Sequence, residues 1–342
     1  MTDSAMSANI AEEYYQIGDS ILASFPKYRP PLDLFRLKED VAQVQLFKKK
    51  EERLSNEQVE ELAALCKAGN LFVSRIDFPI YSRLIVKQLD LVLVDSNLRE
   101  HEIADIALRA LAGRLEDFFA QPVKPTFDAL YGDVQVFTEY IWQDKNRLLL
   151  FIPRLSTGHY SLVNHSLNTL CLGAWLLTVI HKNELHRKKF DRTCMALLLH
   201  DIGMTRVPAF ITSKTTPLKP DEKEKIPPHP TTGMRILEKL DLIHDEFKQI
   251  VLEHHERTDG SGYPQKMHGD RLSLLGGIAA VVDSFSAMIQ KRPYAPAKPP
   301  LEAAKELASV RDKYDTTAVK TLLTAYATND FTIPGHNGSG EK

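Results

Sequence analysis

The sequence predicts a two-domain fold, in which a small α+β domain at residues 1–122 precedes an all-α domain at residues 123–335. The length of 342 residues is enough for two domains that each bury a core of their own. Strand-like patterns occur only before the proline-containing stretch 122–125, and amphipathic helical patterns follow one another after it. The tail at residues 336–342 is rich in glycine and polar residues, so we predict that it is disordered.

The first part of the α+β domain is predicted to contain a helix and a hairpin. Residues 1–9 have the composition of a frayed end, and residues 10–25 carry a helical pattern that stops at Pro26. Residues 34–47 carry closely set, partly alternating apolar side chains, and the charged run 48–53 then turns the chain. We therefore expect a hairpin in this region.

The second part of this domain begins with a helix-start signal. Ser55 and Gln58 have the spacing of a capping box for a helix that ends at Gly69, and residues 71–73 are predicted to form a buried strand. Two longer helical patterns complete the domain, at residues 81–94 and 100–119. Its titratable side chains do not gather in a way that suggests chemistry, so by elimination we expect a sensory or docking role.

The second domain is predicted to consist of helices. The helical patterns cover residues 127–151, 162–180, 192–199, 232–240, 245–256, 272–288, 301–310 and 317–327.

Composition narrows the classes of function. The formal net charge of −2 gives no basic excess for a phosphate backbone, so nucleic acid is not an expected partner, whereas a small anionic ligand remains open. The three cysteines are widely spaced among apolar residues, which predicts buried free thiols in a reducing compartment. The sequence shows no signal peptide and no long uninterrupted apolar run. We therefore expect a cytoplasmic protein without membrane insertion.

Ten of the twelve histidines lie between His159 and His268. The His200-Asp201 pair follows five apolar residues, which indicates a buried helix, and burying both groups is costly unless each has a partner. A metal ion would be such a partner. A simple hydrogen bond between a buried histidine and a carboxylate is the alternative.

Other candidate ligands follow along the chain. Adjacent histidines such as His254 and His255 point about 100° apart, so both face one site only at a helix end or around two nearby ions, which favours a dinuclear centre. Asp283 lies within an apolar helix among small residues. His165 opens a helix, where a satisfied core histidine is the alternative, and His229 precedes a proline and is expected in a loop. Four histidines among charged residues are expected at the surface: His181, His186, His244 and His268.

These residues carry a family resemblance. The sequence resembles the HD-GYP subgroup of the HD superfamily of metal-dependent phosphohydrolases across residues 125–330. The matching segments are His200-Asp201-Ile202-Gly203, His229-Pro230, the run from His254-His255-Glu256 to Gly262-Tyr263-Pro264, the segment around Asp283, and Arg292-Pro293-Tyr294. The resemblance implies an HD-type helical domain that hydrolyses cyclic di-GMP with two or three iron or manganese ions.

The resemblance also implies roles for individual residues. It implies seven metal ligands, with Asp201 bridging two ions and acting with His200 in catalysis: His165, His200, Asp201, His229, His254, His255 and Asp283. Arg292, Tyr263 and Lys298 would bind substrate, although Tyr263 could instead pack the loop of Gly262, Tyr263 and Pro264, and Arg292 could be solvated. Cyclic di-GMP is the implied small-molecule partner. Protein partners of the diguanylate cyclase type, bound through this loop, and a homodimer are further expectations.

Three positions depart from the family pattern. Met204 stands where the family usually has a lysine near the scissile phosphate, which removes a cation from the transition state. Ser161 stands where members with three metals carry a glutamate, so we expect two ions. Ala295 replaces a second basic residue, for which Lys298 could compensate, whereas Arg206 lies two residues beyond Met204 and is expected to point elsewhere.

Three functions are compatible with these residues. The first is a dinuclear phosphodiesterase that converts cyclic di-GMP to pGpG, or further to GMP, under control of the first domain. The second is a weakly active or inactive module that binds cyclic di-GMP or partner proteins. A phosphohydrolase for another nucleotide explains the candidate ligands but not the loop of Gly262, Tyr263 and Pro264.

Overall fold

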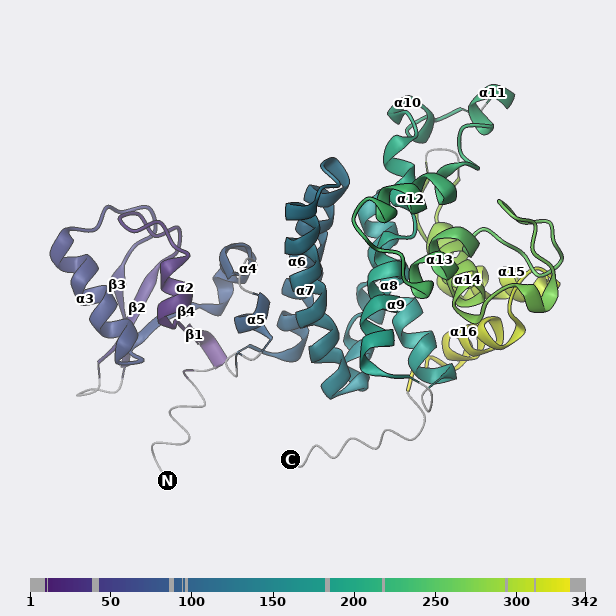
Figure 1. Cartoon of the computed structure of the whole chain (residues 1–342). Helices are drawn as coiled ribbons and strands as arrows, with labels where there is room; N and C mark the ends of the chain where they lie inside the picture. Colours follow the sequence, from purple (N-terminus) through teal and green to yellow (C-terminus); the bar gives the residue numbers. More distant parts are fainter. Residues whose placement is uncertain are drawn as a thin grey trace. The chain divides into compact units, whose positions relative to one another are not determined.

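The computed structural model divides into two compact units, Met1–Ala110 and Leu111–Lys342, which are drawn in sequence colours in Figure 1. It describes residues 10, 12–38, 43–85, 89–93, 95, 98–181, 185–216, 219–292, 295–310 and 312–332. The predicted frayed start at 1–9 and disordered tail at 336–342 lie outside these residues. The division falls within helix α6 (Glu100–Ala120), and the expected functional boundary at residue 122 stays a prediction.

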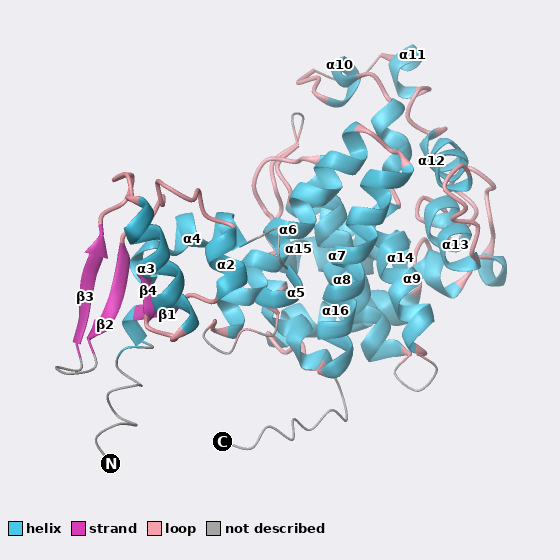
Figure 2. Ribbon diagram, turned by 60° about the vertical axis from the view of Figure 1, so that its left-hand side comes forward, coloured by secondary structure: helices cyan, strands magenta, loops and turns pink. Residues whose placement is uncertain are grey.

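Unit 1 contains a four-stranded sheet in the order β1-β4-β2-β3, in which every pairing is antiparallel. Tyr15, Leu71 and Val73 are fully buried on the sheet, and Figure 2 shows strands and helices together in this unit. The predicted α+β class is confirmed. The elements are β1 (Tyr14–Gln16), α2 (Asp19–Ala23), β2 (Leu34–Lys38), β3 (Gln43–Lys48), α3 (Asn56–Lys67), β4 (Leu71–Ser74), η1 (Arg75–Asp77), α4 (Phe78–Ile85), α5 (Leu89–Val92) and the start of α6.

The predicted helix over residues 10–25 is wrong in its centre, where the chain forms β1. Tyr15 pairs with Val73 of β4, and its ring stacks on Tyr81 with 4.8 Å between centroids. Pairing with a strand that is distant in sequence therefore overrides the local helical pattern. Helical conformation remains at Ile10, Glu12 and Glu13 before β1, and in α2 near the predicted end of that segment.

The other predictions for unit 1 hold with small changes. The antiparallel pairing of β2 with β3 confirms the hairpin, but β3 itself includes Lys48, so the charged run 48–53 does not connect these two strands. Ser55 and Gln58 form the predicted capping box, with Ser55 Oγ accepting from Gln58 N at 3.2 Å. Gly69 follows α3 with φ of +72°, which glycine adopts without strain.

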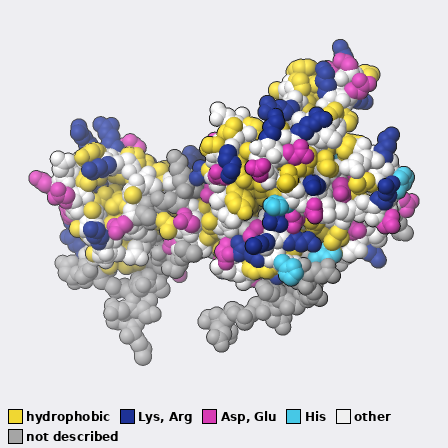
Figure 3. Space-filling model, in the orientation of Figure 1, with side chains coloured by type: hydrophobic (Ala, Val, Ile, Leu, Met, Phe, Trp, Pro, Cys, Tyr) yellow, Lys and Arg dark blue, Asp and Glu magenta, His cyan; other side chains and the backbone are white. Residues whose placement is uncertain are grey.

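Unit 2 is all-α among the residues that the structure describes, as predicted. Its elements after α6 are α7 (Lys124–Gln143), η2 (Lys145–Leu150), η3 (Ile152–Arg154), α8 (Leu162–Ile180), α9 (Arg187–Leu199), η4 (Ile202–Arg206), α10 (Ala209–Thr212), α11 (Pro220–Lys223), α12 (His229–Glu238), α13 (Asp245–Glu253), η5 (Gly269–Arg271), α14 (Leu274–Ile289), α15 (Pro300–Ser309) and α16 (Thr316–Thr328). On the face in Figure 3, basic and acidic side chains are interspersed with apolar ones.

The helix predicted over residues 127–151 is shorter than expected. It ends at Gln143, because Asp144 leaves the helical conformation and its carboxylate accepts from Asn146 N at 2.9 Å, which starts η2. By contrast, α8 has the predicted bounds and packs against α9 and α14. It is long and apolar enough to cross a membrane, but 83% of that stretch is buried inside the protein, as in a core helix.

All three cysteines are buried free thiols, as the composition predicts. Burial raises the pKa of the Cys171 thiol to about 12, so it stays protonated at neutral pH.

The Glu102 carboxylate links separate segments of unit 1. It accepts from the Tyr15 hydroxyl and the Arg99 amide, and it pairs with Arg75 at 2.8 Å. Burial alone would raise the pKa of Glu102, but these donors together lower it. The pairing therefore stabilises the folded state at neutral pH, and this contribution is lost as the pH falls through the folded-state pKa.

Glu102→Ala should lower the free energy of unfolding of unit 1 by about 3 kcal/mol at neutral pH, because it removes the buried carboxylate that pairs with the half-buried Arg75 guanidinium. Urea denaturation measures this change. The control is Glu61→Ala, which removes the exposed partner of Arg36 and should cost less than about 1 kcal/mol. Equal effects of the two variants would contradict a structural role for Glu102.

Candidate metal centre

Two groups of side chains in unit 2 meet around one shared carboxylate. In each group, one ligand atom per residue lies within 4.8 Å of the others, and Asp201 belongs to both groups. The structure thus brings together all seven residues that the sequence singles out as candidate ligands. The first group is His165, His200, Asp201 and Asp283, and the second is Asp201, His229, His254 and His255.

Each candidate ligand comes from the end or the buried face of a helix. His165 lies in the first turns of α8, His200 ends α9, and Asp283 lies in the middle of α14, as predicted. His254 ends α13 and His255 follows it, which is the helix-end position that lets adjacent histidines face one site. All seven side chains except that of His255 are buried.

The prediction that His229 lies in a loop is wrong, because it is the first residue of α12. The first turn of a helix leaves its amides without carbonyl partners inside the helix, so Pro230 is tolerated at the second position. Gly203 allows η4 to approach this helix start, since a Cβ atom there would lie 1.9 Å from the His229 carbonyl oxygen. The start of α12 therefore places the His229 side chain next to Asp201.

Backbone carbonyls set the orientation of three imidazoles. The Nδ1–H groups of His200 and His229 donate to Leu197 O and Ile226 O, each at 2.8 Å, and that of His254 donates to Val251 O at 3.0 Å. A histidine that donates through Nδ1 carries its lone pair on Nε2. All three rings are therefore prepared to bind a cation through Nε2.

The Nε2 atoms converge in pairs. His165 and His200 bring theirs to 3.3 Å, and His229 and His254 to 3.1 Å. His229 Nε2 also lies 3.0 Å from Asp201 Oδ1, and His165 Nε2 lies 3.0 Å from Asp283 Oδ1. Nitrogen lone pairs and carboxylate oxygens at these separations repel one another unless a proton or a cation lies between them. The donor set therefore fits divalent metal ions.

The protonation states suit ligation. Burial alone would raise the pKa of Asp201, but the imidazoles of His200, His229 and His254 hold it well below its usual range. Asp283 is held low in the same way by His255, His165 and His200. Burial lowers the pKa of His254, and burial together with neighbouring His254 lowers that of His255 further. Ionised carboxylates and neutral imidazoles are the forms that bind metals.

Burial would also lower the pKa of His200, but the Asp201 and Asp283 carboxylates raise it instead. A cation that binds His200 through Nε2 would therefore compete with a proton for that atom.

Two buried glutamates next to the histidine pair hold neighbouring segments in place. Glu253 accepts from Ser273 N at 2.8 Å, at the start of the helix that carries Asp283. Glu256 is fully buried and accepts from three successive backbone amides, which are Gln265 N at 2.5 Å, Lys266 N at 3.1 Å and Met267 N at 2.9 Å. Neither role was predicted from the sequence, although a glutamate on each side of the histidine pair was a visible signal.

The loop of Gly262, Tyr263 and Pro264 lies directly against the centre. Tyr263 N donates to His255 O at 3.2 Å, and the two rings lie 4.7 Å apart. Gly260 has φ of +77°, and a Cβ atom at Gly262 would lie 2.4 Å from Arg257 N, so both glycines meet steric requirements of the turn. Burial, Asp283 and Asp201 raise the pKa of the Tyr263 hydroxyl, which therefore stays protonated.

The other predicted substrate-binding residues have different surroundings. The Arg292 guanidinium lies 4.6 Å above the centre of the Tyr160 ring. The Lys298 ammonium forms an ion pair with Glu306 of α15, so it would have to leave this partner to contact substrate. The Ser161 hydroxyl accepts from Asn164 N at 3.1 Å as the N-cap of α8, which gives this serine a structural role.

Among the four histidines expected at the surface, three are exposed and His181 is half-buried at the end of α8. None of these four belongs to either group of candidate ligands among the described residues.

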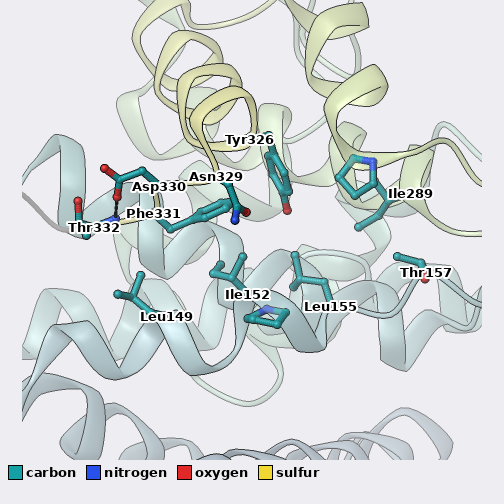
Figure 4. Close-up of a pocket in the computed structure, with 12 residues that line it drawn as sticks. Leu149, Ile152, Leu155, Thr157, Ile289, Tyr326, Asn329, Asp330, Phe331 and Thr332 are labelled. Atoms are coloured by element: carbon teal, nitrogen blue, oxygen red, sulfur yellow. Dashed lines mark hydrogen bonds between the residues drawn. The ribbon is translucent and has the colours of Figure 1, made fainter.

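A separate cavity of about 540 Å³ in unit 2 is largely apolar and contains none of the seven candidate ligands (Figure 4). Its lining residues are Leu149, Ile152, Pro153, Leu155, Thr157, Ile289, Pro300, Tyr326, Asn329, Asp330, Phe331 and Thr332.

Three relatives that match part of this chain are named as phosphodiesterases of cyclic dinucleotides. A cyclic di-GMP phosphodiesterase of Thermotoga maritima is 42% identical over 127 residues, which cover 36% of this chain and 34% of the relative. Cyclic di-GMP phosphodiesterase PA4108 of Pseudomonas aeruginosa is 30% identical over 177 residues, or 52% of this chain and 42% of the relative. The 3′3′-cGAMP-specific phosphodiesterase 2 of Vibrio cholerae is 34% identical over 115 residues, or 33% and 22%. The matches thus span less than half of each of these relatives.

A solved structure, Bd1817, described as an HDG"Y"P protein from Bdellovibrio bacteriovorus, has a TM-score of 0.60 and 16% identity. The alignment covers 92% of this chain and 99% of that one, and at this identity it speaks for the fold alone.

The helical fold of unit 2 and the two groups of histidines and carboxylates define a domain suited to binding metal. The family model of the HD domain matches residues 146–318. The chain therefore belongs to the HD domain family, whose members are metal-dependent, and the HD-GYP type predicted from the motifs is confirmed.

Glu256→Gln should loosen the loop that follows Pro264. In the wild type, three backbone N–H groups share the two carboxylate oxygens of Glu256. In the variant, the side-chain NH2 group would face some of these N–H groups, so buried donors would lose their acceptor. The expected cost is about 1–3 kcal/mol. Hydrogen exchange at residues 265–267 should become faster. The exposed Glu306→Gln is the control, and unchanged exchange in Glu256→Gln would contradict the anchoring role.

Proposed function

We propose that this protein is a metal-dependent phosphodiesterase that hydrolyses cyclic di-GMP to pGpG with two divalent ions. The observation that carries the proposal is the Asp201 carboxylate, which belongs to both groups of candidate ligands. Relatives named cyclic di-GMP phosphodiesterases support the choice of substrate. Because the matches span less than half of these relatives, the activity of the whole chain is a proposal.

The residues would divide the work as follows. Asp201 would bridge the two ions, with His165, His200 and Asp283 completing one site and His229, His254 and His255 the other. When bound, iron or manganese would supply Lewis acidity toward the phosphodiester and the attacking water. Backbone carbonyls keep three imidazoles in the ligating tautomer. Arg292 would contact a phosphate of the substrate.

Several finer expectations belong to the same proposal. We place the reaction in the cytoplasm, with pGpG as the product and GMP as the product of a second hydrolysis. Unit 1 would regulate unit 2. The loop of Gly262, Tyr263 and Pro264 would contact partner proteins of the diguanylate cyclase type, and a homodimer is the assembly to test.

A second candidate function is a weakly active or inactive module that binds the same ligand. Met204 favours it, because this half-buried side chain on η4 stands where the resemblance to HD-GYP proteins implies a lysine. The two functions differ in turnover, not in metal content.

The deciding experiment measures metal content of the anaerobically purified chain and hydrolysis of cyclic di-GMP in the same sample. The expected result is two tightly held ions per chain and conversion to pGpG. A parallel assay with 3′3′-cGAMP tests whether this chain hydrolyses the substrate for which another relative is named. Three tightly held ions, or none, would contradict the dinuclear proposal, and two ions without hydrolysis would favour the binding module.

Asp201→Asn should abolish binding of at least one ion and lower kcat for cyclic di-GMP more than about a thousandfold, because a neutral amide does not bridge two cations. Elemental analysis and steady-state kinetics measure both effects. The exposed Asp270→Asn is the matched control. Wild-type metal content in Asp201→Asn would show that Asp201 is only a hydrogen-bonding partner of buried histidines and not a metal ligand.

Met204→Lys should raise kcat for cyclic di-GMP by about tenfold or more while changing KM less, because negative charge grows in the transition state. Met204→Leu controls for the change in packing. A thermal melt and the metal content show whether lysine at this position is tolerated. A folded, metal-loaded variant without a gain in kcat would contradict the missing cation as the limit on turnover.

A further inference from the structure

The segment before α8 is joined to the segment after α14 by backbone hydrogen bonds. Tyr160 N donates to Lys291 O, and Lys291 N donates to Gly158 O, both at 2.8 Å, so that His159 and Lys291 form a parallel β-bridge. The two helices that this bridge connects carry His165 and Asp283. Their termini, and therefore Tyr160 and Arg292, are fixed relative to the candidate metal centre.

The Tyr160 ring lies close to both a candidate ligand and a cation. Its centroid is 5.6 Å from that of the His165 ring, and the Arg292 guanidinium lies over the ring at 4.6 Å from its centroid. The Arg292 amide donates to Ala295 O at 2.9 Å, which holds the backbone that presents the guanidinium. Tyr160 and Arg292 are both half-buried, so this pair borders solvent while His165 is buried.

A guanidinium that stacks on an aromatic face keeps its N–H donors in the plane of the group, where they remain able to bind an anion. Stacking also restricts the rotamers of the long arginine side chain before an anion arrives, so less conformational entropy is lost on binding. The stack on Tyr160 places these donors on the side of the centre that His165 occupies. A phosphodiester that contacts the candidate metal centre here would meet them.

We propose that Tyr160 is a positioning residue that holds the Arg292 guanidinium beside the His165 side of the centre for contact with a phosphate of the substrate. This rests on the proposed function, since it names a residue that supports substrate binding there. Tyr160 acts through its ring face and not through its hydroxyl. It therefore affects ground-state binding of the phosphate more than the chemical step, and it is not itself a metal ligand.

A double-mutant cycle tests this proposal, with Tyr160→Leu, Arg292→Gln, the double variant, and Tyr160→Phe as the conservative control. The readouts are metal content, kcat, KM and equilibrium binding of a phosphorothioate analogue of cyclic di-GMP that resists hydrolysis. Tyr160→Leu should weaken analogue binding and raise KM about fivefold to thirtyfold, with kcat within about twofold and metal content unchanged. Tyr160→Phe should stay within about twofold of wild type.

The coupling decides between positioning and packing. In the Arg292→Gln background, Tyr160→Leu should weaken binding by less than about twofold more, because its effect passes through Arg292. Additive effects, loss of metal in Tyr160→Leu, or equal losses in Tyr160→Phe and Tyr160→Leu would each overturn the proposal. Thermal melts verify that all four variants are folded.

The cycle also separates this proposal from the proposed function. If the wild-type chain neither hydrolyses cyclic di-GMP nor binds its analogue, the proposed function fails, and the same variants are titrated with inorganic phosphate. Coupled losses of phosphate binding at Tyr160 and Arg292 would still support the positioning role. Phosphate binding that is absent, or independent of either residue, would overturn it.

Discussion

The carboxylate of Asp201, buried among imidazoles, is the constraint on which unit 2 depends. An ionised carboxylate in a protein interior is tolerated only with close, oriented partners, and here these partners come from four separate helices. The C-terminal ends of α9 and α13 and the starts of α8 and α12 must therefore meet at one point. The helical packing of unit 2 is the arrangement that satisfies this requirement.

A second layer of interactions orients the first. Backbone carbonyls fix the tautomers of His200, His229 and His254, and buried Glu253 and Glu256 tie the neighbouring helix and loop to the end of α13. Because such supports determine how precisely ligands are held, they bear on metal affinity as much as the ligands do. The centre is thus preorganised by main-chain groups as well as by side chains.

The sequence predicted the candidate ligands better than their supports. His200-Asp201 and His254-His255 are conspicuous because charged or metal-binding side chains rarely occur beside apolar helical runs, and α8 was predictable from its unbroken helical pattern. The role of Glu256 depends on backbone amides that follow a turn, which no local pattern encodes. Likewise, β1 exists because Tyr15 pairs with Val73, a contact between distant parts of the chain. Local periodicity does not contain this information.

The excursion of the chain that carries α10 and α11 begins after η4 and ends at α12, so candidate ligands lie near both of its ends (Figure 1). Its side chains are largely exposed where described, including Phe210 at 61%, while Ile211 anchors it. The free energy of closing a flexible loop rises only with the logarithm of its length, by about 0.6 kcal/mol for each doubling. Evolution can therefore lengthen, shorten or replace this excursion, or insert a further domain into it, without moving the ligands that it connects.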